Sequence, residues 1–228
     1  MSASAAVIVL AKAPEPGRVK TRLCPPATPD EAADLAAASL LDTLDAAGGV
    51  PGAVPVVVFT GRLAGAARAA ELSAALRGVR VLRQAGDGLG KRIAAAHADT
   101  AALLPGRATL QVGMDTPQAD AALLAASLDR LHAAGTDAVL GLATDGGWWA
   151  LGLRDPRAAV LVADVPTSRD DTGERTLQAL RDGGLRVGLL PELTDVDTAA
   201  DALAVAAAAP DGRFATALAR CPAFAVAS

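Results

Sequence analysis

Short continuous runs of apolar residues alternate with longer helical segments along the chain, and this alternation constrains the fold more than any other feature. Continuous apolar runs are typical of strands that are buried on both faces of a parallel sheet. Six runs are predicted to be strands: residues 6–10, 55–59, 79–83, 109–112, 138–142 and 187–190. The predicted fold class is therefore α/β, a doubly wound, mostly parallel sheet with helices on both faces.

Signals for helix ends support this interpretation. Thr28 is a suitable N-cap, Pro29 suits the first helical position and Glu31 stands at the capping-box position. They predict a helix that runs to about residue 47, before two glycines. Similar signals predict two more helices, one opening at Asp155-Pro156 and one from about Thr172 to Gly183.

No Pro/Gly-rich linker, repeat or low-complexity tail divides the 228 residues, so we expect a single domain, residues 1–228. The apolar runs are much shorter than the roughly 20 residues of a membrane span. The first apolar run is followed directly by Lys12, and no basic segment of the kind that begins a secretion signal precedes it. We therefore expect a cytoplasmic protein with no membrane partner. Alanine-rich helix faces suit a core or a second subunit equally, so the oligomeric state is left open.

The rare residue types limit the chemistry. The net charge of −4 disfavours a general nucleic-acid surface. Cys24 and Cys221 form no CxxC pattern, and His97 and His132 both fall in alanine-rich helical stretches. A cysteine zinc site or a histidine-based triad is therefore not expected. The chemistry must rest on carboxylates, lysines, arginines, backbone amides and a metal.

The first predicted strand leads into a loop rich in positive charge. Lys12, Arg18, Lys20 and Arg22 fall within eleven residues. Gly17 and the prolines keep this loop non-helical, so that its backbone amides can face an anion. The chain has three lysines among 21 basic residues, and two of them are here. Because a compact ammonium suits phosphate oxygens, the loop is predicted to bind phosphate. The alternative is a solvated basic loop.

A glycine-rich turn follows the third predicted strand. It contains Gly86, Asp87, Gly88 and Gly90, and Lys91 lies just inside the next helix. Glycines allow the backbone to approach a ligand closely, and a turn at a helix N-terminus favours anions. We predict that this turn also contacts the ligand. The alternative is that its glycines only end the strand.

Aspartates follow two further strands. Asp115 comes directly after residues 109–112, at a strand exit next to the predicted phosphate loop. This position suits a carboxylate that holds Mg²⁺ or Mn²⁺, although Asp115 or Thr116 could instead cap a helix. Asp195 and Asp197 follow the last predicted strand and point to one side if their segment is extended. They are predicted to complete the metal site, the alternative being a capping box that begins at Thr198.

Both tryptophans of the chain stand together in the segment from Asp145 through Gly146, Gly147 and Trp148 to Trp149. On a strand, neighbouring indoles point in opposite directions. One of them could therefore pack in the core while the other forms a platform for a sugar or an acceptor. Asp145 could bond hydroxyl groups or act as a base. The alternative is that both indoles only pack.

Five segments, in this order, resemble the radical-SAM/selenodomain-associated transferases, which are also described as arsenosugar-biosynthesis-type glycosyltransferases. They are AKAPEPGRVKTRL (11–23), QAGDGLGKR (84–92), GMDTP (113–117), ATDGGWWALGL (143–153) and TDVDTAADAL (194–203). The resemblance implies a Rossmann-like GT-A nucleotide-diphospho-sugar transferase fold. This chain departs from the family pattern at Met114, Lys91 and the two tryptophans.

The resemblance also implies residue roles. It places Gly17, Arg18, Lys20 and Arg22 at nucleotide phosphates and Asp115 at a metal. Together with the composition of the segments, it gives the predicted site. Catalysis is assigned to Asp115, Asp145 and Lys20. Nucleotide binding is assigned to Lys12, Gly17, Arg18, Lys20, Arg22, Gly86, Asp87 and Gly90. The metal, Mg²⁺ or Mn²⁺, is assigned to Asp115, Asp195 and Asp197. Substrate binding is assigned to Asp145, Gly146, Gly147, Trp148 and Lys91.

Three functions fit these residues. The first is glycosyl transfer from a nucleotide-sugar to a small-molecule acceptor, which the resemblance favours. The second is nucleotidyl transfer from a nucleoside triphosphate to a phosphorylated small molecule, which requires positioning and charge neutralisation more than a dedicated base. The third is a nucleotide-binding relic without turnover.

Overall fold

The computed structural model describes residues 5–224 and contains one seven-stranded sheet, in the order β3-β2-β1-β4-β6-β5-β7. The strands are β1 (Ala5–Lys12), β2 (Ala53–Thr60), β3 (Arg80–Arg83), β4 (Ala108–Gly113), β5 (Ala138–Leu142), β6 (Trp148–Leu153) and β7 (Val187–Leu189). Six of them run in one direction, and β6 runs antiparallel to its neighbours β4 and β5. The expected mostly parallel α/β fold is confirmed.

The sequence analysis located six of these strands and missed β6. This strand follows β5 after a turn that contains Gly146, which has a φ of 86°. A tight turn joins antiparallel strands, whereas parallel neighbours need a long crossover. The reversal has a consequence for the site, because it brings the amino end of β6 to the edge of the sheet where the other strands have their carboxyl ends.

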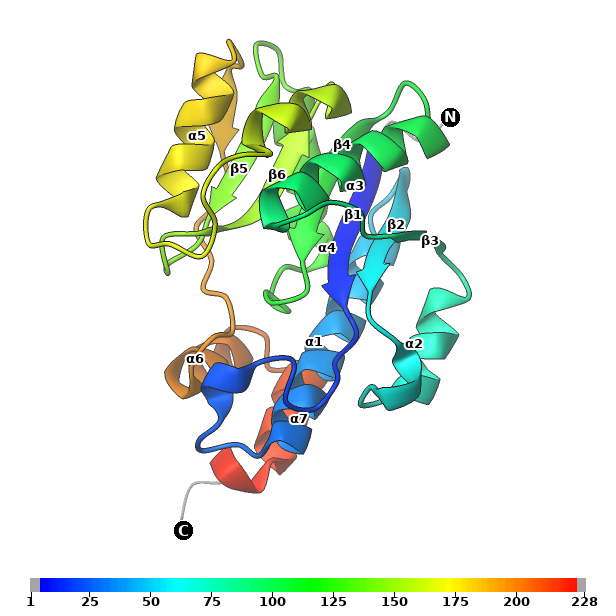
Figure 1. The fold of residues 1–228 in the computed structure, drawn as a ribbon, viewed down its shortest axis with the longest axis vertical. Helices are drawn as coiled ribbons and strands as arrows, with labels where there is room; N and C mark the ends of the chain where they lie inside the picture. The colour runs from blue at the N-terminus through cyan, green and yellow to red at the C-terminus, as the bar shows by residue number, and fades with distance from the viewer. Residues whose placement is uncertain (1–4, 225–228) are drawn as a thin grey trace.

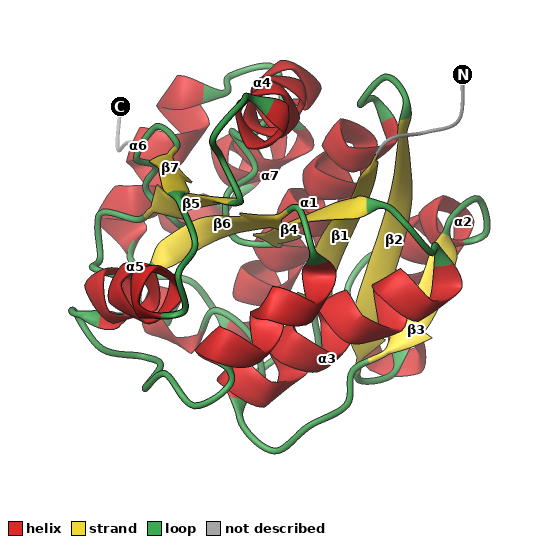
Figure 2. Ribbon diagram, turned by 90° about the horizontal axis from the view of Figure 1, so that it is seen from above, coloured by secondary structure: helices red, strands yellow, loops and turns green. Residues whose placement is uncertain are grey.

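Helices cover both faces of the sheet, as Figure 2 shows in a view along its edge. On one face lie α1 (Pro29–Gly48) and α4 (Ala121–His132), and on the other lie α3 (Leu89–Leu103) and α5 (Thr172–Asp182). The short helix α2 (Ala69–Leu76) lies beside β3 at one edge. The 3₁₀ helix η3 (Pro156–Val162) packs against α3. Three further 3₁₀ helices are η1 (Thr21–Leu23), η2 (Leu63–Gly65) and η4 (Pro222–Phe224).

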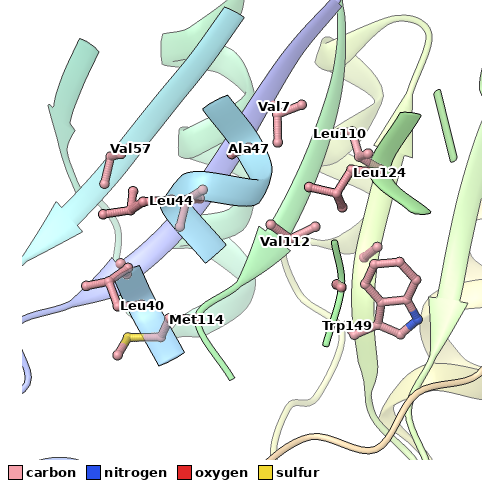
Figure 3. Close-up of a cluster of buried hydrophobic side chains, with 14 of the residues drawn as sticks. Val7, Leu40, Leu44, Ala47, Val57, Leu110, Val112, Met114, Leu124 and Trp149 are labelled. Atoms are coloured by element: carbon pink, nitrogen blue, oxygen red, sulfur yellow. The ribbon is translucent and has the colours of Figure 1, made fainter. Parts of the chain in front are cut away.

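The largest core cluster lies between the sheet and the α1–α4 layer. Figure 3 shows Leu40 and Leu44 of α1 in one cluster with Val112 of β4, Leu124 of α4 and Trp149 of β6. Each of these side chains is buried. At about 25 cal/mol per Å² of apolar surface removed from water, burial of such side chains is the main force that holds α1 to the sheet.

The caps of α1 and α5 are as the sequence predicts. Glu31 N donates to Thr28 Oγ1 at 3.3 Å and Thr28 N donates to a Glu31 carboxylate oxygen at 2.7 Å, which closes the capping box. Helix α5 ends before Gly183. The predicted helix at Asp155-Pro156 forms as the 3₁₀ helix η3, with Asp155 as its cap.

Two C-terminal helices, α6 (Ala199–Ala208) and α7 (Arg213–Arg220), pack beyond the carboxyl edge of the sheet, with α7 along α1 (Figure 1). Phe214 and Leu218 of α7 are buried in a second cluster with Leu35 of α1. Ahead of these helices the chain returns to the loop after β1, where residues 196 and 197 contact Lys20 and Arg22. Among residues 5–224, no helix combines the length and apolar character of a membrane span.

Candidate active site

A cleft of about 860 Å³ opens at the edge where the six parallel strands end. It is lined by the ends of β1, β2 and β4, by the turn after β5, by the start of β6 and by neighbouring loops. In open α/β sheets, ligands bind outside the carboxyl ends of the strands. The volume falls within the range of small-molecule and cofactor sites, roughly 300–1,000 Å³.

Most of the predicted site residues meet in this cleft. They are Lys12, Arg18, Lys20, Arg22, Asp115, Asp145, Gly147, Trp148, Asp195 and Asp197. Gly17, Gly86, Asp87, Gly90, Lys91 and Gly146 do not line it in the described part of the chain. Both tryptophans border the cleft, but Trp149 is buried in the α1–α4 core whereas Trp148 is half-buried against a cluster on the other face of the sheet, so the two indoles point in opposite directions.

The loop after β1 places one of its lysines deep in the cleft. Lys20 has a left-handed backbone conformation with φ 47°, and its side chain is 7% exposed. Its ammonium contacts the Asp115 carboxylate and donates to the carbonyl of Val196, and Asp197 Oδ1 lies 3.9 Å away. Lys20 therefore neutralises part of the negative charge of Asp115 and Asp197, and it joins the loop after β1 to the loops that carry these two aspartates.

The remaining cations of this loop are exposed and accessible. Arg22 Nη1 lies 2.6 Å from Asp197 Oδ2, and Arg18 Nη1 lies 3.3 Å from Glu15 Oε2, both at exposed positions. Salt bridges of this kind contribute about 0–1 kcal/mol, because water competes for the charges. Their loss on ligand binding would cost little, so both guanidinium groups are available to an anion such as phosphate.

Three aspartates from two segments form an acidic group. Carboxylate oxygens of Asp145, Asp195 and Asp197 lie within 4.8 Å of one another. Burial, reinforced by the negative charges of Asp145 and Asp197, raises the pKa of Asp195 to about 6. The charge of the group is therefore incompletely compensated by Lys20 and Arg22. Oxygen donors with excess negative charge fit a hard divalent cation such as Mg²⁺ or Mn²⁺.

The structure arranges the predicted metal ligands differently from the sequence analysis. Asp145, expected to contact substrate, joins Asp195 and Asp197, whereas Asp115 is bound to Lys20 outside this group. Asp115 still borders the cleft, and its carbonyl accepts from Val196 N at 2.9 Å. Its role as a metal ligand stays a prediction.

Hydrogen bonds hold residues 191–193 against the turn between β5 and β6 and the start of β6. Leu193 forms an isolated parallel bridge with Ala143, and Thr144 N donates to Leu193 O at 3.0 Å. Trp149 Nε1 donates to Pro191 O at 2.9 Å. These contacts explain how carboxylates about 50 positions apart in the sequence come together. The predicted capping box at Thr198 is confirmed, since Thr198 forms it with Asp201 at the start of α6.

The glycine-rich turn serves packing at one of its positions. A Cβ on Gly90 would lie 2.5 Å from Ala163 O, so this glycine permits close approach of α3 to η3. Gly86 has a φ of 114°, which disfavours other residues. Arg92 rather than Lys91 reaches the cleft from this region.

Sequence reasoning missed several residues of the cleft. Residues 167–170 line one wall, and Arg169 Nε and Arg175 Nε hold this loop by contacts with Asp171 at 2.8 and 2.7 Å. Gln84 and Gln111 line another part. A detectable signal existed for Gln111, because it is a polar residue within an otherwise continuous apolar strand.

The model of a bacterial protein family matches residues 43–169, which is more than half of the chain. Its description is "Uncharacterized protein conserved in bacteria (DUF2064)". The chain belongs to this family. A comparison with curated proteins found no match.

Solved structures place the DUF2064 chain among transferase folds. A protein from Desulfovibrio desulfuricans G20, named as a candidate nucleotide-diphospho-sugar transferase, is 26% identical with a TM-score of 0.78, over 99% of this chain and 94% of its own. CMP:2-keto-3-deoxy-manno-octonic acid synthetase, solved with CTP, is 13% identical with a TM-score of 0.54, over 90% and 97%. 4-Diphosphocytidyl-2C-methyl-D-erythritol synthase from Anaerococcus prevotii DSM 20548 is 11% identical with a TM-score of 0.55, over 90% and 98%. The predicted GT-A-like fold is confirmed, and the narrower radical-SAM and arsenosugar relationship stays a prediction.

Proposed function

We propose that this DUF2064 protein is a nucleotide-dependent transferase that moves a glycosyl group from a nucleotide-sugar to a small acceptor, assisted by Mg²⁺ or Mn²⁺. One observation carries the proposal: a cationic loop and a group of three aspartates line the same cleft at the carboxyl edge of the sheet. A nucleoside diphosphate bound through a divalent cation presents the complementary charges to both.

The cations and carboxylates have separate roles in this proposal. Arg18 and Arg22 bind the phosphates from the open side, and Lys20 supplies a buried positive charge beside them. Asp145, Asp195 and Asp197 hold the divalent cation. When bound, the cation supplies charge neutralisation for the diphosphate leaving group. Lys12, the glycine-rich turn and Asp115 are further contacts expected from the sequence.

Glycosyl transfer is the first candidate for two reasons. The D. desulfuricans protein is similar along 99% of this chain and carries a nucleotide-diphospho-sugar name. In addition, Trp148 is half-buried in the wall of the cleft, and an indole face is a suitable platform for a sugar ring. The acceptor then lies near Trp148, Gly147 and the loop of residues 167–170.

Nucleotidyl transfer is the second candidate, and the environment of Asp145 favours it. Asp145 Oδ1 accepts from Gly147 N at 2.7 Å, and Asp145 belongs to the acidic group. It is therefore poorly placed as a dedicated base. Within residues 5–224 no histidine lines the cleft. Phosphoryl-type chemistry depends mainly on positioning and charge, which these residues supply.

A thermal-shift screen followed by product analysis tests the proposal. Nucleoside triphosphates, nucleoside diphosphates and nucleotide-sugars are compared, each with and without Mg²⁺ or Mn²⁺. A ligand at 100 times its Kd stabilises the native state by about 2.7 kcal/mol, which is readily measured. We expect metal-dependent stabilisation by one nucleotide-sugar, and release of a nucleoside diphosphate when an acceptor is supplied.

The other outcomes are equally informative. Stabilisation by a triphosphate and release of pyrophosphate would replace glycosyl transfer by nucleotidyl transfer. Binding of a nucleotide without turnover, across a panel of acceptors, would indicate a relic. Absence of any shift would overturn nucleotide binding at this cleft.

A further inference from the structure

Gln111 of β4 is a buried polar side chain that the proposed chemistry does not use. It is 2% exposed, it lines the cleft, and its Oε1 has no hydrogen-bond partner in the described part of the chain. Its neighbours Leu110 and Val112 face the α1–α4 core, so alternation directs Gln111 to the opposite face, beneath α3. An unpaired buried acceptor destabilises a fold, which makes its position beside a cleft significant.

Gln84 provides a contrast within the same cleft. Its Nε2 donates to Ala11 O at 2.8 Å and to Val58 O at 3.2 Å, which joins the chain after β3 to β1 and β2. The Gln84 amide therefore has a structural role that is satisfied without a ligand. The oxygen of Gln111 has no such role and no hydrogen-bond partner within the described residues.

The surroundings of Gln111 indicate what kind of group it meets. It lies within β4, two residues before the strand ends at Gly113, whereas Lys20, Arg22 and the aspartates lie in loops beyond the strand ends and Arg92 is the cation that α3 contributes to the cleft. Two residues of a strand span about 6–7 Å. Gln111 is therefore set back along the strand from the acidic group and from the cations of the loop after β1.

Apolar side chains complete the surroundings of Gln111. Leu10 of β1 and Ile93 of α3 line the cleft together with Leu89, the first residue of α3. Leu89 is 45% exposed, unusual for a leucine at the mouth of a polar cleft. A flat, uncharged ring that carries N–H groups satisfies both the apolar surface and the free acceptor.

We propose that Gln111 reads the base of the bound nucleotide, with its Oε1 accepting a hydrogen bond from a ring or exocyclic N–H while Leu89 and Ile93 cover the ring. This inference rests on the proposed function and adds a residue that determines nucleotide specificity. A site built to hydrogen-bond one group discriminates against analogues that lack it, because its own polar atom then stays unpaired.

The test compares wild type with Gln111→Met, which keeps the length of the side chain and removes the amide. The probes are the triphosphates and diphosphates of the four ribonucleosides, together with inorganic pyrophosphate, all with Mn²⁺ in titration calorimetry. We expect affinity for the preferred base to fall roughly tenfold or more, affinities for the other bases to fall less, and pyrophosphate affinity to stay unchanged. The preference among bases should therefore shrink.

Stability measurements give a second readout that needs no ligand. Gln111→Met should raise the Tm, since the substitution removes a buried acceptor that has no hydrogen-bond partner. Gln84→Met should lower the Tm, since it removes the two hydrogen bonds that the amide nitrogen donates to Ala11 O and Val58 O. Thr100→Val is the control for binding: its hydroxyl is also buried and unpaired, but it lies outside the cleft, so its affinities should match those of wild type.

Three results would overturn the inference. Equal losses of affinity for all four bases would place Gln111 at the ribose. Unchanged affinities would show that Gln111 does not contact the ligand. A drop in Tm like that of Gln84→Met would show that its role is structural. Failure of the proposed function is distinguishable, because wild type itself would then bind neither the nucleotides nor pyrophosphate. Binding by wild type that Gln111→Met retains in full overturns only the role of Gln111.

Discussion

The side chain of Lys20 illustrates how one residue can serve folding and ligand binding. Its ammonium is buried beside Asp115 and Val196, whereas Arg18 and Arg22 of the same loop are exposed. A buried ammonium is tolerated only where oxygen atoms replace its water. The sequence analysis selected Lys20 for phosphate binding because lysines are rare here. The structure adds a partner that the sequence does not reveal.

The acidic group makes a prediction at the residue scale. In the absence of metal, Asp195→Asn should raise the Tm, because it removes one of three carboxylates that repel one another. The same change should abolish stabilisation by Mn²⁺, because a ligand oxygen with its charge is lost. Thermal unfolding with and without Mn²⁺ measures both effects.

A matched control is Asp99→Asn, which removes an exposed carboxylate of α3 outside the cleft. Its response to Mn²⁺ should equal that of wild type. If Asp195→Asn retained the full Mn²⁺ shift, the three aspartates would not be the metal site.

At the scale of elements, the contact between α3 and η3 shows why motif glycines are ambiguous. The sequence QAGDGLGKR suggested a ligand-binding turn, and Gly90 in it was assigned to the nucleotide. In the structure Gly90 is buried against the carbonyl of Ala163. A glycine that permits close packing and one that permits close approach of a ligand look identical in a sequence.

Gly90→Ala therefore should destabilise the protein, by about 1–3 kcal/mol as for other overpacked sites, because the new methyl group collides with η3. Gly48→Ala, at the end of α1 where nothing lies within 4 Å, should be neutral or stabilising by up to about 1 kcal/mol. Urea unfolding of both variants measures the difference. Equal stabilities would contradict the packing role of Gly90.

At the scale of the whole molecule, the buried histidine between α3 and β4 links stability to pH. His97 is fully buried, and its Nδ1 lies 2.7 Å from Thr109 Oγ1. Burial lowers its pKa from 6.5 to about 3. Between these two values the imidazole binds a proton in the unfolded chain but not in the native state. The contribution of His97 to the free energy of unfolding is therefore fully present above pH 6.5 and is lost as the pH falls from there toward 3.

This linkage predicts a measurable slope. From pH 7 to pH 5, His97 should remove about 2 kcal/mol from the free energy of unfolding. His97→Gln should flatten the pH dependence by that amount, whatever its own cost at pH 7. His132→Gln, at an exposed position near the end of α4, should leave the slope as it is. Urea unfolding at both pH values decides, and equal slopes for wild type and His97→Gln would refute the linkage.

Much of the fold could be predicted because its signals are local. Apolar runs locate six strands, and the cap at Thr28 locates α1, since each depends on residues within a few positions of one another. The basic residues after the first strand and the aspartates after later strands are likewise visible within short segments, so the sequence could indicate an anion site and a cation site. Strand β6 was missed because its reversed direction depends on its pairing with β4 and β5.

The sequence by itself determined the fold class, the cationic loop after β1 and the presence of aspartates at the edge where strands end. Only the tertiary structure decided which groups act together. It grouped Asp145 with Asp195 and Asp197, paired Lys20 with Asp115, and left the oxygen of Gln111 unpaired beside a cleft. The physical reason is distance along the chain: Lys20 reaches the carbonyl of a residue 176 positions away. Such a contact accompanies the packing of α7 on α1 and of α6 on α7, which no local pattern encodes.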